Sequence, residues 1–254
     1  MRNLAIAVIS LHFASWGWAG AEYRSHPRSP LGEFRAGARA SPNPPEAPSS
    51  THLPANALKP ETVRAAAEKA LAELSELITA ENFRELGLEA LGETNRLAPG
   101  EPMALYEIQL NSATQAAAGE TGRMPASRQV LVPIELDFQT RLGLVLTREL
   151  SDWKVVTFGN SRFTRRVAEV RRRTAEATGL PASAFALVSW PRLNAHFLGY
   201  EQAGIFKLAA AWTPAELKWE VGQSRPAVEA FAVLAALWTK ILAESHEAGH
   251  PVAR

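Results

Sequence analysis

The sequence His246-Glu247-Ala248-Gly249-His250 matches the pattern H-E-x-x-H. On an α-helix, two histidines four residues apart lie on one face, so both imidazoles can bind a Zn²⁺ ion while the glutamate activates a water molecule. The pattern therefore predicts a candidate metal site at His246 and His250, and a zinc-dependent hydrolase is one function to consider.

The same five letters resemble the H-E-A-G-H helix of the membrane-bound ATP-dependent zinc proteases. In this chain, however, Gly249 and Pro251 disfavour a rigid helix at the motif. The four residues after His250 do not supply the downstream third ligand that such proteases use. We therefore favour a solvated helix end and expect no resident cofactor, with zinc as the alternative.

Other catalytic chemistry has little support in the sequence. His196 lies between Ala195 and Phe197 in an expected strand, which favours a half-buried, hydrogen-bonded histidine over a general base. The chain contains no G-x-S-x-G pattern and no glycine-rich phosphate loop. We predict no catalytic residue.

Two groups of residues are candidates for partner binding. The first is a cluster of arginines on one expected helix, which predicts a cationic face for an acidic partner, a polyanion or lipid headgroups, with a solvated face as the alternative: Arg162, Arg165, Arg166, Arg171, Arg172 and Arg173. The second is Trp212 and Trp219, which flank a loop-like segment where aromatic side chains can line a binding surface or belong to the core.

The elements that position these residues follow from hydrophobic periodicity. Helical spacing predicts helices from Pro60 to about Ile78, from Asn160 to about Gly179, and from about Pro226 to Ser245. A period of two predicts strands at 103–110, 129–138, 142–150, 153–158, 184–190, 195–200 and 204–212. Pro133 predicts an edge or a bulge in the second strand.

The resulting order is α-ββββ-α-βββ-α, with short connections between the strands. Short connections favour antiparallel hairpins, and segregated helices and strands favour an α+β fold with helices packed on one face of the sheet. The strands form one sheet or two, and two related halves near 61–159 and 160–254 are an open alternative.

The amino terminus indicates export. Arg2 precedes an apolar run from Leu4 to Ser15, and Ala19-Gly20-Ala21 fits a signal-peptide cleavage site, so we expect the mature chain to begin at Glu22. Residues 22–60 hold eight of the 17 prolines and few large apolar residues, which predicts a disordered linker before a globular domain at 61–254. We expect a periplasmic or extracellular protein with no transmembrane segment in the mature chain.

Composition narrows the function classes. The chain has no cysteine, which excludes disulfides, thiol nucleophiles and thiolate metal sites. Loss of residues 1–21 removes one arginine and no acid, which leaves 26 basic and 26 acidic residues. A neutral exported chain is a poor match for nucleic-acid binding.

Three clusters together are similar to a loose group of uncharacterised exported bacterial proteins, over residues 62–212. The clusters are Asn82 to Leu88 with Leu91, Gly100 to Met103 with Tyr106, and Val132 to Ile134 with Trp153 and Gly159. The resemblance implies export and a compact mixed fold. It implies no catalytic residue.

These observations predict an exported, non-enzymatic binding module that recognises a protein or peptide through a sheet edge and the arginine face. A protease-inhibitor, propeptide-like or chaperone-like role is the most concrete version. The alternatives are the zinc-dependent hydrolase and a small-ligand carrier with a pocket between helices and sheet.

Overall fold

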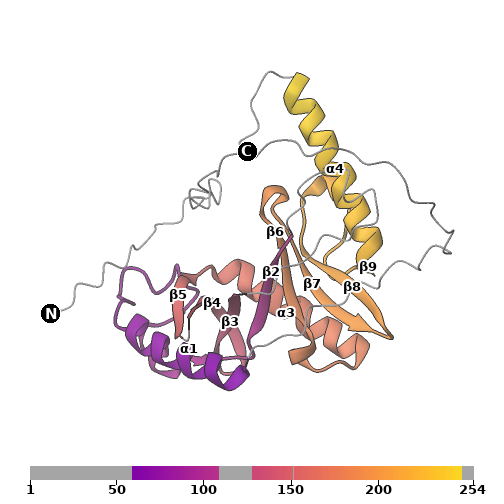
Figure 1. The fold of residues 1–254 in the computed structure, drawn as a ribbon. Coiled ribbons are helices and arrows are strands. Elements are labelled where there is room, and N and C mark those ends of the chain that lie inside the picture. Colours follow the sequence, from indigo (N-terminus) through magenta and orange to yellow (C-terminus); the bar gives the residue numbers. More distant parts are fainter. Residues whose placement is uncertain (1–58, 109–127, 151, 248–254) are drawn as a thin grey trace, which may run out of the picture. The chain divides into compact units, whose positions relative to one another are not determined.

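The computed structural model describes residues 59–108, 128–150 and 152–247, all within one compact unit, Ala47–Arg254 (Figure 1). The predicted leader, almost all of the predicted linker and His250 lie outside the described residues.

Three α-helices in the described part of the chain confirm the three predicted ones: α1 Pro60–Ser75, α3 Ser161–Thr178 and α4 Ala227–Glu247. Pro60 begins α1, where its missing N–H group costs no hydrogen bond. Gly179 ends α3 in the left-handed conformation, with φ of 72°. Asn160 is the N-cap residue of α3 as expected, but its side chain makes no capping hydrogen bond.

The predicted strands are also present, with two short additions that the sequence analysis missed, β1 and β9. The strands are β1 Ala98–Pro99, β2 Met103–Glu107, β3 Gln129–Leu136, β4 Gln139–Glu149, β5 Asp152–Gly159, β6 Ala186–Trp190, β7 Ala195–Gln202, β8 Ile205–Trp212 and β9 Ser224–Pro226. Four short 3₁₀ turns lie between these elements: η1 Leu91–Arg96, η2 Ala182–Ala184, η3 Pro191–Leu193 and η4 Ala215–Leu217.

The described strands form one sheet in the order β5-β4-β3-β2-β6-β7-β8-β9, and β1 pairs with β3 beyond the end of β2. All described neighbours are antiparallel except β2 and β6, which are parallel, with Leu105 opposite Leu187. Pro133 lies inside the sheet rather than at an edge, and a register shift follows it between Ile134 and Glu135. The extra residue at this shift is Arg141 of β4, and Pro133 itself pairs regularly with Gly143, so the prediction of an edge or a bulge at Pro133 is wrong.

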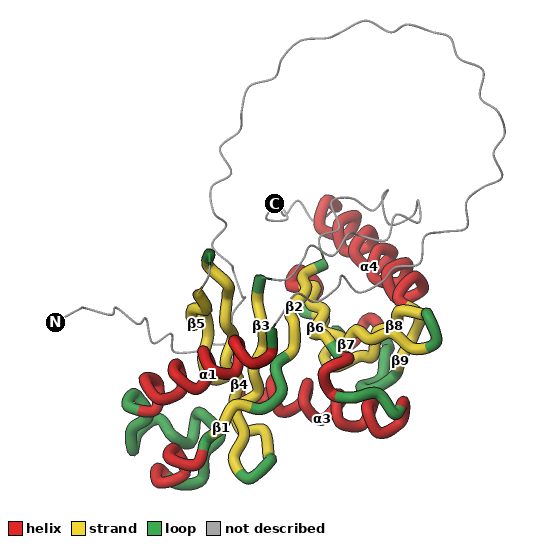
Figure 2. Tube along the Cα trace, turned by 60° about the horizontal axis from the view of Figure 1, so that its bottom comes forward, coloured by secondary structure: helices red, strands yellow, loops and turns green. Residues whose placement is uncertain are grey.

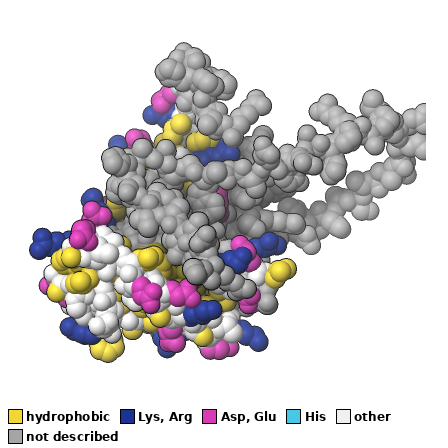
Figure 3. Space-filling model, turned by 90° about the vertical axis from the view of Figure 1, so that its left-hand side faces the viewer, with side chains coloured by type: hydrophobic (Ala, Val, Ile, Leu, Met, Phe, Trp, Pro, Cys, Tyr) yellow, Lys and Arg dark blue, Asp and Glu magenta, His cyan; other side chains and the backbone are white. Residues whose placement is uncertain are grey.

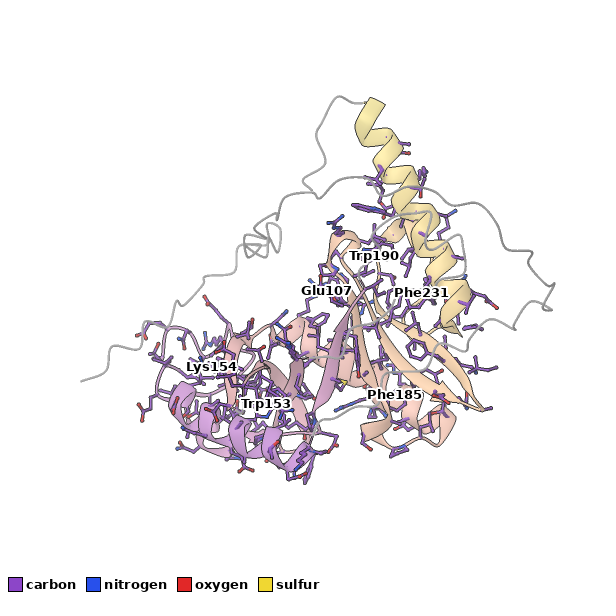
Figure 4. All side chains as sticks on the ribbon, viewed as in Figure 1. Glu107, Trp153, Lys154, Phe185, Trp190 and Phe231 are labelled. Carbon is purple, nitrogen blue, oxygen red and sulfur yellow. The ribbon has the colours of Figure 1, made fainter. Side chains whose placement is uncertain are left out.

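The α+β fold class is confirmed, but the helices cover both faces of the sheet. One face packs against α1 through Val130, Val132 and Leu144 and against α4 through Val188 and Phe197 (Figure 2). Trp190 and Phe231 lie in the layer between this face and α4 (Figure 4). The opposite face packs against α3, through residues that include Leu131, Leu187 and Leu198.

The distribution of helices follows from the strand order. Strands β2–β5 followed by α3, and β6–β9 followed by α4, are two meanders that run outward from the parallel β2–β6 pair. Two identical meanders in this order would be related by a two-fold rotation about an axis along β2 and β6, and such a rotation exchanges the faces of a sheet. The helix after the first meander therefore lies on one face and the helix after the second lies on the other.

The sheet curls around the first turn of α3. Thr164 lies directly against Gly143 of β4, while the ring of its neighbour Phe163 lies 4.7 Å from the ring of His196 of β7. In a flat sheet, β4 and β7 would be about 19 Å apart, since neighbouring strands are spaced by roughly 4.8 Å. The curl brings β4 and β7, which three strands separate, to one turn of α3 and places α3 beside His196.

Candidate functional site

The six arginines predicted as one cationic face fall into four different environments. Arg171 is buried, and its guanidinium donates a hydrogen bond to the Glu101 carbonyl oxygen at 2.8 Å. Burial lowers the pKa of Arg171, while the carboxylates of Glu135 and Glu101 raise it. Arg171 therefore stabilises the fold from inside, and the expectation that it belongs to an exposed face is wrong.

Arg172 and Arg173 are exposed but neutralised by acids of their own helix. Arg172 pairs with Glu169 at 3.0 Å and with Glu176 at 2.6 Å, and Arg173 pairs with Glu169 at 2.5 Å. These hydrogen bonds lower the pKa of the Glu169 carboxyl. Ion pairs at this helical spacing are the expected stabilising arrangement on a solvent-exposed helix face.

Arg162 and Arg166 lie instead over the indole ring of Trp212, on β8. Their guanidinium carbons are 5.6 and 5.2 Å from the ring centroid, within the range of cation–π interactions. Arg165 points elsewhere, and its Nε donates to the Ser161 carbonyl oxygen. Of the six arginines, Arg162 and Arg166 alone lie over one of the predicted tryptophans.

A row of side chains on neighbouring strands continues from Trp212. The register places Ser189 of β6 opposite His196 of β7, and His196 opposite Trp212 of β8. The Ser189 hydroxyl oxygen is 3.0 Å from Nδ1 of His196, and Phe163 of α3 meets the His196 ring edge-on. We call Arg162, Phe163, Arg166, Ser189, His196 and Trp212 the Trp212 site.

A register shift between His196 and Phe197 helps to assemble the Trp212 site. Phe197 pairs with Ala210, whereas His196 pairs with Trp212, so Ala211 is the extra residue of a β-bulge. Bulges re-aim side chains at strand ends. Here β8 ends directly after the bulge, at Trp212, and the indole of Trp212 lies beneath Arg162 and Arg166 of α3.

Burial keeps His196 neutral. It lowers the pKa of the imidazole from 6.5 to about 4, because a charged ring is disfavoured away from water. This agrees with the expectation of a hydrogen-bonded, half-buried histidine. A neutral imidazole leaves the positive charge of the site to the two guanidinium groups.

Trp219 lies on the other face of the sheet, in the hydrophobic core beneath α4. Its Nε1 donates to the Gln223 carbonyl oxygen at 2.9 Å, and its ring packs against Phe197. Trp219 is therefore a core residue, the alternative that the sequence analysis left open, and it does not join Trp212 in one surface.

The two edges of the described sheet differ. The outermost strand on one side, β9, has three residues and includes Pro226, which has no N–H group to donate. The outermost strand on the other side, β5, has eight residues and pairs with β4, with a register shift that makes Val156 the extra residue of a β-bulge. Val155 and Val156 of β5 are 42% and 44% exposed, although valines usually lie inside.

The surroundings of the β5 edge are mixed in character. Trp153 packs partly into the core, and Lys154 forms an ion pair with Glu149 of β4 (Figure 4). Figure 3 faces the side of the molecule where β5 and α1 lie in Figure 1, and its described surface has apolar side chains among charges of both signs. A partner-binding sheet edge is a prediction from the sequence, and the strand order identifies β5 as the longer of the two edges.

The predicted metal site falls at the limit of the described residues. His246 lies in the last turn of α4, and His250 lies outside the described part of the chain. Among the residues that the structure describes, no group of three or more His, Cys, Asp or Glu side chains is placed to hold a metal ion. Within the same residues, no helix is both long and apolar enough to cross a membrane.

Comparison with known proteins gives no match to a family model, a curated protein or a solved structure.

Proposed function

We propose that this protein is an exported, non-enzymatic binding module that captures an extended segment of a partner protein on the free edge of β5. The contrast between the two sheet edges supports this proposal above all. A protein that only needed to prevent edge pairing could shorten both edges as β9 is shortened, whereas the bulge at Val156 interrupts the ladder of β5 without shortening the strand. Instead, β5 keeps eight residues and two exposed valines.

Addition of a strand would pair the main-chain N–H and C=O groups of this edge and would also cover its two exposed valines. The main-chain groups on the outer side of β5 would bond to the partner backbone, which supplies affinity for any extended segment. The side chains of Val155 and Val156 would lose contact with water, which contributes about 25 cal/mol per Å² of apolar surface. A protease-inhibitor, propeptide-like or chaperone-like role uses this mode of binding.

The test begins with extended peptides selected from a displayed random library against the mature full chain. Peptide binding should protect the amides of β5 from hydrogen exchange. The double variant Val155→Lys and Val156→Lys places two charges on the edge and should weaken binding by at least tenfold.

A matched control is available on the same molecule. Val221 and Val228 are 42% and 58% exposed and lie away from β5, so Val221→Lys with Val228→Lys makes the same chemical change elsewhere. This control should bind the peptide within twofold of the unmodified protein. Equal binding by both double variants, or protection confined to other strands, would overturn the proposal.

Export is part of the proposal and has its own test. The charged start, the apolar run and the small residues at 19–21 support cleavage by a signal peptidase. Sequencing the amino terminus of protein recovered outside the cytoplasm should give Glu22 as the first residue. Recovery of the intact chain from the cytoplasm alone would contradict export.

A further inference from the structure

We infer that Arg162, Arg166 and Trp212 form a binding site for a carboxylate group. This inference does not depend on the proposed role of β5, because the two surfaces involve different residues. It rests on the charge, stacking and hydrogen-bonding state of the two arginines.

The first observation is that no described acidic side chain neutralises the positive charges of Arg162 and Arg166. No ion pair among the described residues includes Arg162 or Arg166. The same helix neutralises Arg172 and Arg173 with Glu169 and Glu176, so acids are present farther along α3 and missing at its start.

The second observation is the position of these charges on the helix. The first turn of α3 has no acidic residue, although acids are favoured there because the amino end of a helix is positive. Arg162 and Arg166 are also four residues apart, a spacing at which like charges repel. Both effects destabilise the free protein, and a bound anion would reverse both.

The third observation concerns geometry. Both guanidinium groups lie over one ring, with carbon-to-centroid distances of 5.6 and 5.2 Å. Neither group makes a hydrogen bond to another described residue. Within the described part of the chain their N–H donors are therefore unused, while the indole restricts where each guanidinium lies.

A carboxylate fits these donors. The planar guanidinium presents two parallel N–H groups at the spacing of the two carboxylate oxygens, which gives a bidentate, charge-assisted pair. An acidic side chain and a chain end present the same group, so the experiment must distinguish these two sources.

The experiment follows the indole N–H resonance of Trp212 in the mature full chain by NMR, with Trp212→Phe used only to assign that signal. The probes are N-acetylaspartic acid amide for a side-chain carboxylate, N-acetylglycine for a chain end, and inorganic phosphate for comparison. We expect one or both carboxylates to shift the resonance saturably, and the tighter of the two identifies the source.

Two double variants test which arginines are responsible. Arg162→Gln with Arg166→Gln should weaken carboxylate binding by at least tenfold. Arg172→Gln with Arg173→Gln removes the same charge from the same helix and should change the affinity by less than twofold. Thermal melting of both variants confirms that each is folded.

Three results would overturn the inference. They are no saturable shift in the unmodified protein, equal affinity in the two double variants, and tighter binding of phosphate than of either carboxylate. The Val155→Lys and Val156→Lys variant should bind the carboxylate normally, so failure at β5 and failure at Trp212 are distinguishable.

Discussion

The Ser189 hydroxyl and Nδ1 of His196, 3.0 Å apart, join β6 to β7 on the face of the sheet that α3 covers. The ring of Phe163 packs edge-on against the imidazole. The pair is thus held between the sheet and the helix, where an uncharged imidazole is favoured.

This environment predicts a pH-dependent stability. The His196 pKa is lowered from 6.5 to about 4 in the folded protein, so the unfolded chain binds a proton in this interval and the folded protein does not. The free energy of unfolding should therefore fall as the pH falls from 6.5 to about 4, by up to about 3 kcal/mol. Urea unfolding at a series of pH values measures the change.

The control for this prediction is His196→Gln, which cannot take up the proton. Its stability should depend less on pH between 6.5 and 4 than that of the unmodified protein. Parallel pH profiles for the two proteins would show that other groups cause the loss.

Gly143 should be intolerant of a side chain. A methyl group at this position would overlap the hydroxyl of Thr164, which is buried and hydrogen-bonded to the Asn160 carbonyl oxygen at 3.1 Å. We expect Gly143→Ala to lower the free energy of unfolding by about 1–3 kcal/mol, the usual effect of overpacking. Thermal or denaturant unfolding provides the measurement.

Two further variants separate the overlap with Thr164 from the general effect of replacing glycine with alanine. In the Gly143→Ala background, Thr164→Ala removes the overlapping atoms and should recover part of the loss. Gly92→Ala adds a methyl group where no atom lies within 4 Å and should change stability little. Equal losses for Gly92→Ala and Gly143→Ala would contradict the packing explanation.

The turn between β3 and β4 should become more stable when Phe138 is replaced. Asp137 and Phe138 form a two-residue turn with φ of 50° and 64°, and Phe138 is 96% exposed. Hairpin turns of this kind favour glycine at the second position, because a bulky residue is strained there. Phe138→Gly should raise the free energy of unfolding by about 0.5–1 kcal/mol.

Phe138→Ala is the informative comparison in the same denaturant measurement. Alanine removes the exposed ring but keeps the strained backbone, so its stability should stay below that of Phe138→Gly. If alanine stabilises the protein as much as glycine does, exposure of the ring is the cause rather than backbone strain.

The metal hypothesis has a direct test in elemental analysis of the purified mature chain. A binding module of the proposed kind should contain much less than one equivalent of zinc, with no difference after His246→Ala and His250→Ala. Near-stoichiometric zinc that disappears in this double variant would instead support the hydrolase alternative.

The helices and the longer strands could be predicted because their signals depend on residues close together in the sequence. Pro60 and Gly179 mark helix ends because their backbone preferences act within one turn. The strands of the two meanders were predicted because alternating burial is also a local pattern. In contrast, β9 has only three residues, and a run this short has too few alternations to predict a strand.

The candidate site depends on contacts that periodicity cannot supply. Six arginines in one helix predict a cationic face, but their separate roles depend on which carboxylates and rings lie beside them. Trp212 and Trp219 flank the same loop-like segment in the sequence, yet they lie on opposite faces of the sheet. Ser189 and Phe163 became site residues only through strand register and the curl of the sheet around α3.

The parallel pairing of Leu105 with Leu187 has a consequence for the order of folding. Each meander is joined by contacts between neighbouring strands, whereas this ladder joins residues roughly eighty positions apart. Closing such a long loop costs conformational entropy, and the contacts between β2 and β6 offset this cost only after both strands are ordered. The two meanders should therefore form first, and docking of β2 on β6 should limit the folding rate.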